Sequence, residues 1–195
     1  ENTWAGLFDA MRQVAGNTLG GVEPSFKEGL PNLYCGVGSM ILAVLFLTCK
    51  EVKLRDKFFS LVLLIFFMVS FIVRQLDYIW HGFHFTNMIP YRFSFLFSFV
   101  VLYMAYKAWT LRDSFRLWQL ILAGLAAAGL IWASESRTDP LFLAWNLGFS
   151  SLYLIALGCC LPGKVPVPAE GEEEADPEEV LRYVAQTDRR RAFAA

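Results

Sequence analysis

The chain has 195 residues, of which 56% are hydrophobic and 18% are charged, and its formal net charge is −1. This composition is far too apolar for a soluble domain, and the apolar runs are long enough to cross a bilayer, so the sequence predicts a polytopic membrane protein. No nucleic-acid partner is expected. The four cysteines lie in or at the ends of apolar runs and indicate neither a disulfide framework nor a thiolate metal site.

Residues 1–31 precede the first apolar run and contain apolar side chains at steps of three and four: Trp4, Leu7, Phe8, Met11 and Val14. This spacing predicts an amphipathic helix that lies flat on the outer membrane surface, followed by a loop rich in Gly and Pro. The chain opens with Glu1, and we see no signal peptide before the first apolar run. We therefore expect the sequence to be an internal piece of a longer protein.

Five apolar runs follow, and each is close to the ~20 residues with which a helix crosses ~30 Å of hydrocarbon. They cover roughly residues 33–49, 58–76, 93–111, 115–133 and 141–161. The predicted fold class is therefore all-α, a polytopic membrane helix bundle of about five transmembrane helices over residues 32–161. In the fourth run, small residues lie four apart (Ala123 with Ala127, Gly124 with Ala128), and we favour packing within the bundle over dimerisation.

Basic residues are concentrated in the first connection, residues 50–57, and around the third connection, which places both in the cytoplasm by the positive-inside rule. The connection of residues 77–92 and the short connection of residues 134–140 then lie outside. Residues 162–195 form a polar, acidic tail, which we expect to be cytoplasmic and largely disordered. Within it, Asp176 and Pro177 have the pattern of a helix start, so a short helix to about Thr187 is expected.

The connection of residues 77–92, with Arg74 just before it, is the best candidate for a functional surface. Its candidate substrate-binding residues are Arg74, Asp77, Trp80, His81, His84, Asn87, Tyr91 and Arg92. The two guanidinium groups suit phosphate or pyrophosphate oxygens. The two imidazoles suit headgroup contact, a hydrogen bond to a sugar hydroxyl, or proton transfer near neutral pH.

Structural roles compete with this interpretation. An interfacial ion pair between Arg74 and Asp77 explains both residues equally well, and an aromatic belt is the favoured role for Trp80 and Tyr91 taken singly. No metal or cofactor is predicted, because a zinc site needs three or four ligands and the histidines have no suitable Glu or Cys nearby. Residues 93–99 alternate like a strand, but we expect a helix because the bilayer demands internal backbone hydrogen bonds.

The stretch Tyr78-Ile79-Trp80-His81-Gly82-Phe83, then Asn87, then Pro90-Tyr91-Arg92-Phe93-Ser94-Phe95-Leu96-Phe97-Ser98-Phe99, closely resembles the YfhO family of bacterial membrane proteins. Pro31-Asn32-Leu33-Tyr34-Cys35-Gly36 and the Lys-rich connection after the first run look like the same family, and the resemblance covers roughly residues 20–135. It implies a multi-pass protein of the bacterial cytoplasmic membrane with a GT-C-like glycosyltransferase fold.

The resemblance also implies an activity. Such enzymes are thought to take a sugar from a polyprenyl-phosphate carrier outside the cytoplasmic membrane and to place it on a cell-envelope polymer, lipoteichoic acid being the example for this family. The implied partners are therefore a lipid-linked sugar donor, a cell-envelope polymer acceptor and membrane lipids. Cationic groups must stabilise the departing lipid phosphate, a task for Arg74, Arg92 and the two histidines, and a carboxylate usually activates the acceptor.

The sequence departs from the family pattern in two ways. Family members have many more spans, and GT-C enzymes generally keep a catalytic acid in the first outer loop near their N-terminus, which this sequence does not contain, so no catalytic residue is assigned. The leading hypothesis is the C-terminal half of an envelope glycosyltransferase, inactive alone. The alternatives are a non-catalytic lipid-carrier binding or translocation subunit and a bundle whose outer loop docks a partner. If residues 181–191 lead into a further outer domain, the tail lies outside instead.

Overall fold

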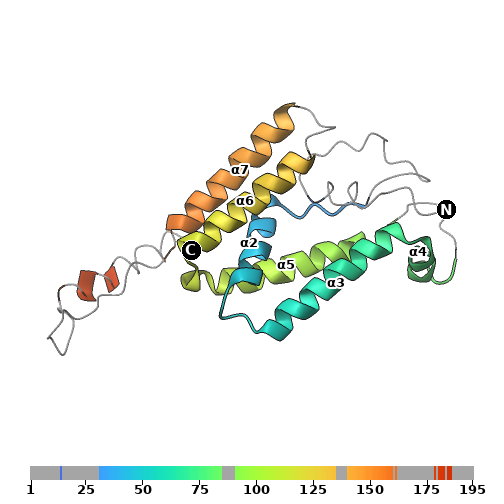
Figure 1. Cartoon of the computed structure of the whole chain (residues 1–195), viewed down its shortest axis with the longest axis horizontal. Coiled ribbons are helices and arrows are strands. Elements are labelled where there is room, and N and C mark those ends of the chain that lie inside the picture. Colours follow the sequence, from blue (N-terminus) through green and yellow to red (C-terminus); the bar gives the residue numbers. More distant parts are fainter. Residues whose placement is uncertain are drawn as a thin grey trace.

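The computed structural model describes residues 31–84, 91–134, 140–159 and 161, together with Val14 and residues 178, 180–182 and 184–185 of the tail. Within these ranges the regular structure is entirely helical (Figure 1). The helices are α2 (Val37–Thr48), α3 (Leu54–Ile72), α4 (Arg74–Trp80), α5 (Ser94–Thr110), a 3-10 turn (Arg112–Ser114), α6 (Leu117–Ser134) and α7 (Pro140–Cys159). The predicted amphipathic helix lies outside the described residues except for Val14, and the described tail residues from 178 to 185 are helical.

Helix α2 forms the centre of the bundle, with α6 and α7 side by side on one flank and α3 and α5 side by side on the other (Figure 1). It contacts α5, α6 and α7, and its side chains are apolar around most of the helix, as expected for a buried helix. The main core joins Ile41 and Phe46 of α2 to Met104 of α5 and to Ala123 and Ala127 of α6. The buried small residues of α6 therefore pack within the chain, as predicted.

Two glycines allow α7 to approach its neighbours closely. A Cβ atom placed on Gly38 of α2 would lie 2.9 Å from Cε1 of Tyr153, and one placed on Gly124 of α6 would lie 2.9 Å from Cδ1 of Leu154. Real Cβ atoms are not found so close to other carbons, so both contacts depend on the missing side chain. The Tyr153 contact is the more rigid of the two, because three ring atoms lie within 3.2 Å of the Gly38 position.

Polar side chains fix the connections at the C-terminal end of α2, which ends at Thr48. The buried Gln119 donates from Nε2 to the carbonyl oxygen of Thr48 (2.8 Å), and its Oε1 accepts from the backbone N–H of Arg116 (2.7 Å). The side-chain amide of Gln119 therefore provides a hydrogen-bond donor for a carbonyl group in the last turn of α2 and an acceptor for the N–H group just before α6. The second of these bonds is one half of a capping box. Similarly, Lys57 of α3 donates from Nζ to the carbonyl oxygen of Cys49 just after α2.

The predicted second apolar run, residues 58–76, does not form one straight helix. Helix α3 ends at Ile72, Val73 is extended (φ −93°, ψ 110°), and α4 leaves at an angle of 104° to α3. Two β-branched residues in succession, followed by the charged and polar Arg74 and Gln75, disfavour a straight continuation into hydrocarbon. Taken singly, none of the described helices is both long and apolar enough to cross a membrane, and α3 and α4 meet that requirement only as a bent pair.

The other four predicted runs agree with helices α2, α5, α6 and α7 to within a few residues. The helical nature of residues 94–99 is confirmed, because α5 begins at Ser94. On this helix Ser98 faces the chain's interior and donates to the carbonyl oxygen of Leu33 (3.4 Å). The all-helical class is therefore confirmed for the described residues, whereas the number of membrane crossings stays a prediction.

Candidate functional site

A column of three aromatic rings holds α4 against the end of α3 and the start of α5. The ring of Phe93 is stacked on Trp80 (centroids 5.0 Å apart, planes at 13°) and on Phe71 (5.1 Å, 15°). Phe93 and Phe71 are buried, and Trp80 also contacts the rings of Phe66 and Phe67 of α3. Offset stacked pairs contribute about 0.5 to 1.5 kcal/mol each beyond the area they bury. The bend at Val73 is therefore supported by packing of α4 on its neighbours.

Tyr91 lies beneath this column rather than at the surface. It is 3% exposed, its ring meets Phe71 edge to face (5.9 Å, 79°), and it belongs to a second core with Leu33, Phe67 and Phe97. Tyr91 therefore packs the floor of the site, whereas Trp80 keeps part of its ring exposed. Sequence reasoning treated both as surface aromatics, because spacing alone does not say which ring turns inward.

Asp77 and His81 form a nearly buried pair on one face of α4. Nδ1 of His81 lies 2.8 Å from the backbone carbonyl oxygen of Asp77 and 3.3 Å from its Oδ1, and the two side chains are only 11% and 14% exposed. A carbonyl oxygen can only accept, so Nδ1 carries the proton and the lone pair of the neutral ring is on Nε2. Nε2 is buried, and among the described residues it has no hydrogen-bond partner.

Sequence reasoning paired Asp77 with Arg74 and missed the contact with His81. The signal was present, since residues four apart on a helix are neighbours on its surface. The imidazole of His81 also meets the ring of Phe93 edge to face (6.3 Å, 73°), so the aromatic column fixes the imidazole as well as the helix. The imidazole is therefore oriented by a backbone carbonyl oxygen of its own helix, with the Asp77 carboxylate oxygen 3.3 Å from the same nitrogen.

Two bulky residues with left-handed backbone flank the connection after α4. Phe83 and Tyr91 both have φ of 61°, and Gly82, which directly precedes Phe83, has φ of 68°. Such conformations cost about 1 to 3 kcal/mol each and persist only where the surroundings hold them. The ring of Phe83 is held by Tyr78 (5.9 Å, 74°) and Tyr91 by the second core. The ends of this connection are therefore fixed, as expected of a segment that presents side chains to a ligand.

Three of the remaining predicted residues are exposed and lie close to this pair in the sequence or next to its aromatic neighbour Phe93. Arg74 is exposed at the first residue of α4, His84 is exposed just after its end, and Arg92 is exposed next to Phe93. Asn87 lies outside the described residues. Among the residues whose placement the structure gives, no three His, Cys, Asp or Glu side chains are grouped closely enough to hold a metal ion. The site therefore combines exposed cations with a largely covered carboxylate and imidazole.

Comparison with known proteins identifies the family of the chain. The family model of the bacterial membrane protein YfhO matches residues 1–163, which is more than the residues 20–135 over which the sequence motifs were recognised. No curated protein and no solved structure matches the chain. Because the family model covers most of the sequence and includes both helices of the aromatic column, the chain belongs to the YfhO family of bacterial membrane proteins.

Proposed function

We propose that this chain is part of a multi-pass envelope glycosyltransferase of the bacterial cytoplasmic membrane. It uses a polyprenyl-phosphate-linked sugar on the outer face to decorate a cell-wall polymer such as lipoteichoic acid. One observation carries the proposal: Asp77 orients His81 through its backbone carbonyl oxygen on a short helix that the aromatic column fixes, and the exposed Arg74 begins this helix. The pair supplies a proton acceptor, and the cations Arg74 and Arg92 supply partners for a phosphate.

The reaction can be divided between these groups. A hydroxyl oxygen of the acceptor forms a bond to the anomeric carbon, and the bond from that carbon to the lipid phosphate breaks. The hydroxyl proton passes to Nε2 of His81, and Asp77 stabilises the resulting imidazolium. The negative charge that develops on the departing phosphate is balanced by the guanidinium groups of Arg74 and Arg92. Nε2 is covered in the free chain, so acceptor binding must open the site, as is common for catalytic hydrogen bonds.

Sugar transfer in membranes that contain the whole protein tests the proposal. Arg92→Ala should abolish transfer without loss of membrane-extracted protein, and His81→Gln should lower the rate by about 10² to 10⁴-fold, the usual contribution of a general base. The matched control is Arg116→Ala, which removes an exposed cation outside the site. Unchanged transfer in both site variants would refute the assignment. Aggregation or degradation of Arg92→Ala would instead show that Arg92 has a structural role.

A non-catalytic lipid-carrier binding or translocation subunit is the second candidate. The burial of Nε2 of His81 favours it, because the base is covered while the arginines that would hold a phosphate are exposed. In this case the chain binds the carrier headgroup, and the bond between the sugar and the lipid phosphate is not broken. His81→Gln then leaves both carrier binding and sugar transfer unchanged, whereas Arg92→Ala weakens binding. Comparing the two variants in one binding assay and one transfer assay therefore separates the two functions.

A further inference from the structure

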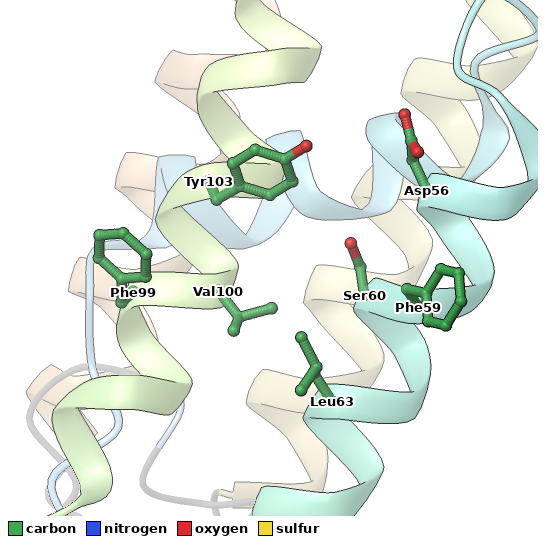
Figure 2. Close-up of a pocket in the computed structure, with 7 residues that line it drawn as sticks. All are labelled: Asp56, Phe59, Ser60, Leu63, Phe99, Val100 and Tyr103. Atoms are coloured by element: carbon green, nitrogen blue, oxygen red, sulfur yellow. The ribbon is translucent and has the colours of Figure 1, made fainter.

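A groove runs between α3 and α5, away from the α4 site. It has a volume of about 260 Å³ and is lined by Asp56, Phe59, Ser60, Leu63, Phe99, Val100 and Tyr103 (Figure 2). On α3, the lining residue closest to the aromatic column is Leu63, eight residues before Phe71, which is about 12 Å along the helix at 1.5 Å per residue. The groove is therefore a separate surface with its own side chains.

The groove has a polar end and an apolar end. Asp56, Ser60 and the hydroxyl group of Tyr103 lie toward one end, whereas Leu63 and Val100 lie toward the other (Figure 2). Ser60 is the most informative of these residues. A helical serine that faces apolar surroundings commonly bonds back to the carbonyl four residues earlier, as Ser70 does to Phe66 (2.8 Å). Among the described residues no such bond forms for Ser60, whose hydroxyl points into the groove (Figure 2).

The polar end lies beside the basic connection before α3. Residues 50–57 contain four basic side chains against two acidic ones, Glu51 and Asp56. Lys57 is engaged with the carbonyl oxygen of Cys49, but Lys53 is exposed and the Arg55 side chain is 76% exposed, 3.8 Å from the Asp56 carboxylate. An excess of cations at the end of an apolar groove is complementary to an amphiphile with an anionic headgroup.

We propose that this groove binds one anionic phospholipid whose headgroup carries free hydroxyls, of the phosphatidylglycerol type. Its phosphate contacts Lys53 and Arg55, and a headgroup hydroxyl donates to the Asp56 carboxylate. Ser60 and Tyr103 donate to the ester and glycerol oxygens, and an acyl chain lies along Leu63. The volume is below the roughly 300 to 1,000 Å³ of sites that enclose a whole small molecule, as expected for a groove that holds part of a lipid. A soluble anion would leave the apolar end unused.

Lipid retention by the purified full chain tests this site. The protein is reconstituted in phosphatidylcholine bilayers that contain equal minor amounts of phosphatidylglycerol and phosphatidylethanolamine, and it is then extracted in mild detergent. Mass spectrometry counts the lipids that remain bound. We expect phosphatidylglycerol to be retained in preference to phosphatidylethanolamine. Leu63→Trp, which fills the groove, should abolish this preference, whereas Val62→Trp should keep it. The two residues are adjacent and equally exposed (44%), so the pair is closely matched.

A second variant tests the headgroup contact without any change to the packing. Lys53→Ala should lower phosphatidylglycerol retention about fivefold, since one basic side chain near an anionic lipid contributes about 1 kcal/mol. Arg116→Ala, an equal loss of charge elsewhere, should leave retention unchanged. Equal retention of the two lipids by the unaltered chain would overturn the proposal. So would equal retention by Leu63→Trp and Val62→Trp, whatever their absolute levels.

Discussion

Replacing Phe93 with leucine tests whether the aromatic column holds α4 in place. The substitution keeps an apolar side chain at a buried position but removes both stacked pairs, with Trp80 and with Phe71. At about 0.5 to 1.5 kcal/mol for each pair, the loss is about 1 to 3 kcal/mol, or roughly 5- to 150-fold in the ratio of docked to undocked α4. Helices α6 and α7 contribute no described residue to the second core, which contains Phe93 and Phe71, so the effect should not reach them.

Hydrogen exchange of the backbone amides measures this loss directly. In Phe93→Leu, exchange in residues 74–80 should be faster by the same 5- to 150-fold, whereas exchange in α6 should stay as it was. Phe95→Leu is the control, because Phe95 lies on the same helix but its side chain is 65% exposed and belongs to neither core. If the two variants exchange equally in residues 74–80, the column does not hold α4 and the structural basis of the Asp77–His81 site is refuted.

Two further substitutions probe the scaffold, each measured by thermal unfolding in detergent. Gln119→Leu leaves the carbonyl of Thr48 and the N–H of Arg116 without their partner and should cost about 1 to 3 kcal/mol, while an unchanged melting temperature would show that water satisfies both groups. Gly38→Ala forces a Cβ atom against the ring of Tyr153 and should cost about 1 to 3 kcal/mol. The cost should vanish in a Tyr153→Ala background, and a cost that persists there would contradict the proposed clash.

The sequence predicts the helices well, because apolar runs of this length in a membrane protein have few alternatives to a helix. Four of the five runs agree with helices, and the strand-like alternation of residues 93–99 is correctly overruled by the need for internal hydrogen bonds. The break at Val73 could not be predicted from hydropathy, since residues 58–72 are apolar up to the bend. What decides it is a contact between distant rings, Trp80 on Phe93, and sequence periodicity carries no information on such pairs.

The membership of the candidate site stays a prediction, and its arrangement comes from the structure. The sequence grouped the charged and aromatic residues of the 77–92 connection, whereas the burial of Tyr91 and the orientation of His81 by the backbone carbonyl of Asp77 are seen in the structure alone. The role of Gln119 as a cap on two helices was missed, although a glutamine three residues after a helix start is a recognisable signal. The groove was missed because side chains from two helices form it, and the sequence does not specify which residues of the two helices face each other.

Both proposed surfaces involve α3, since the groove lies between α3 and α5 and α4 packs against the end of α3. Helices α2, α6 and α7 are joined by close contacts at Gly38 and Gly124. Helix α3 has no comparable contact with α6 or α7 and meets mainly α5 and α4, so most of its apolar side chains are exposed. An exposed apolar helix in a membrane protein faces lipid. The two proposed ligands, a carrier lipid at one end of α3 and a phospholipid at the other, can therefore reach their sites from the bilayer.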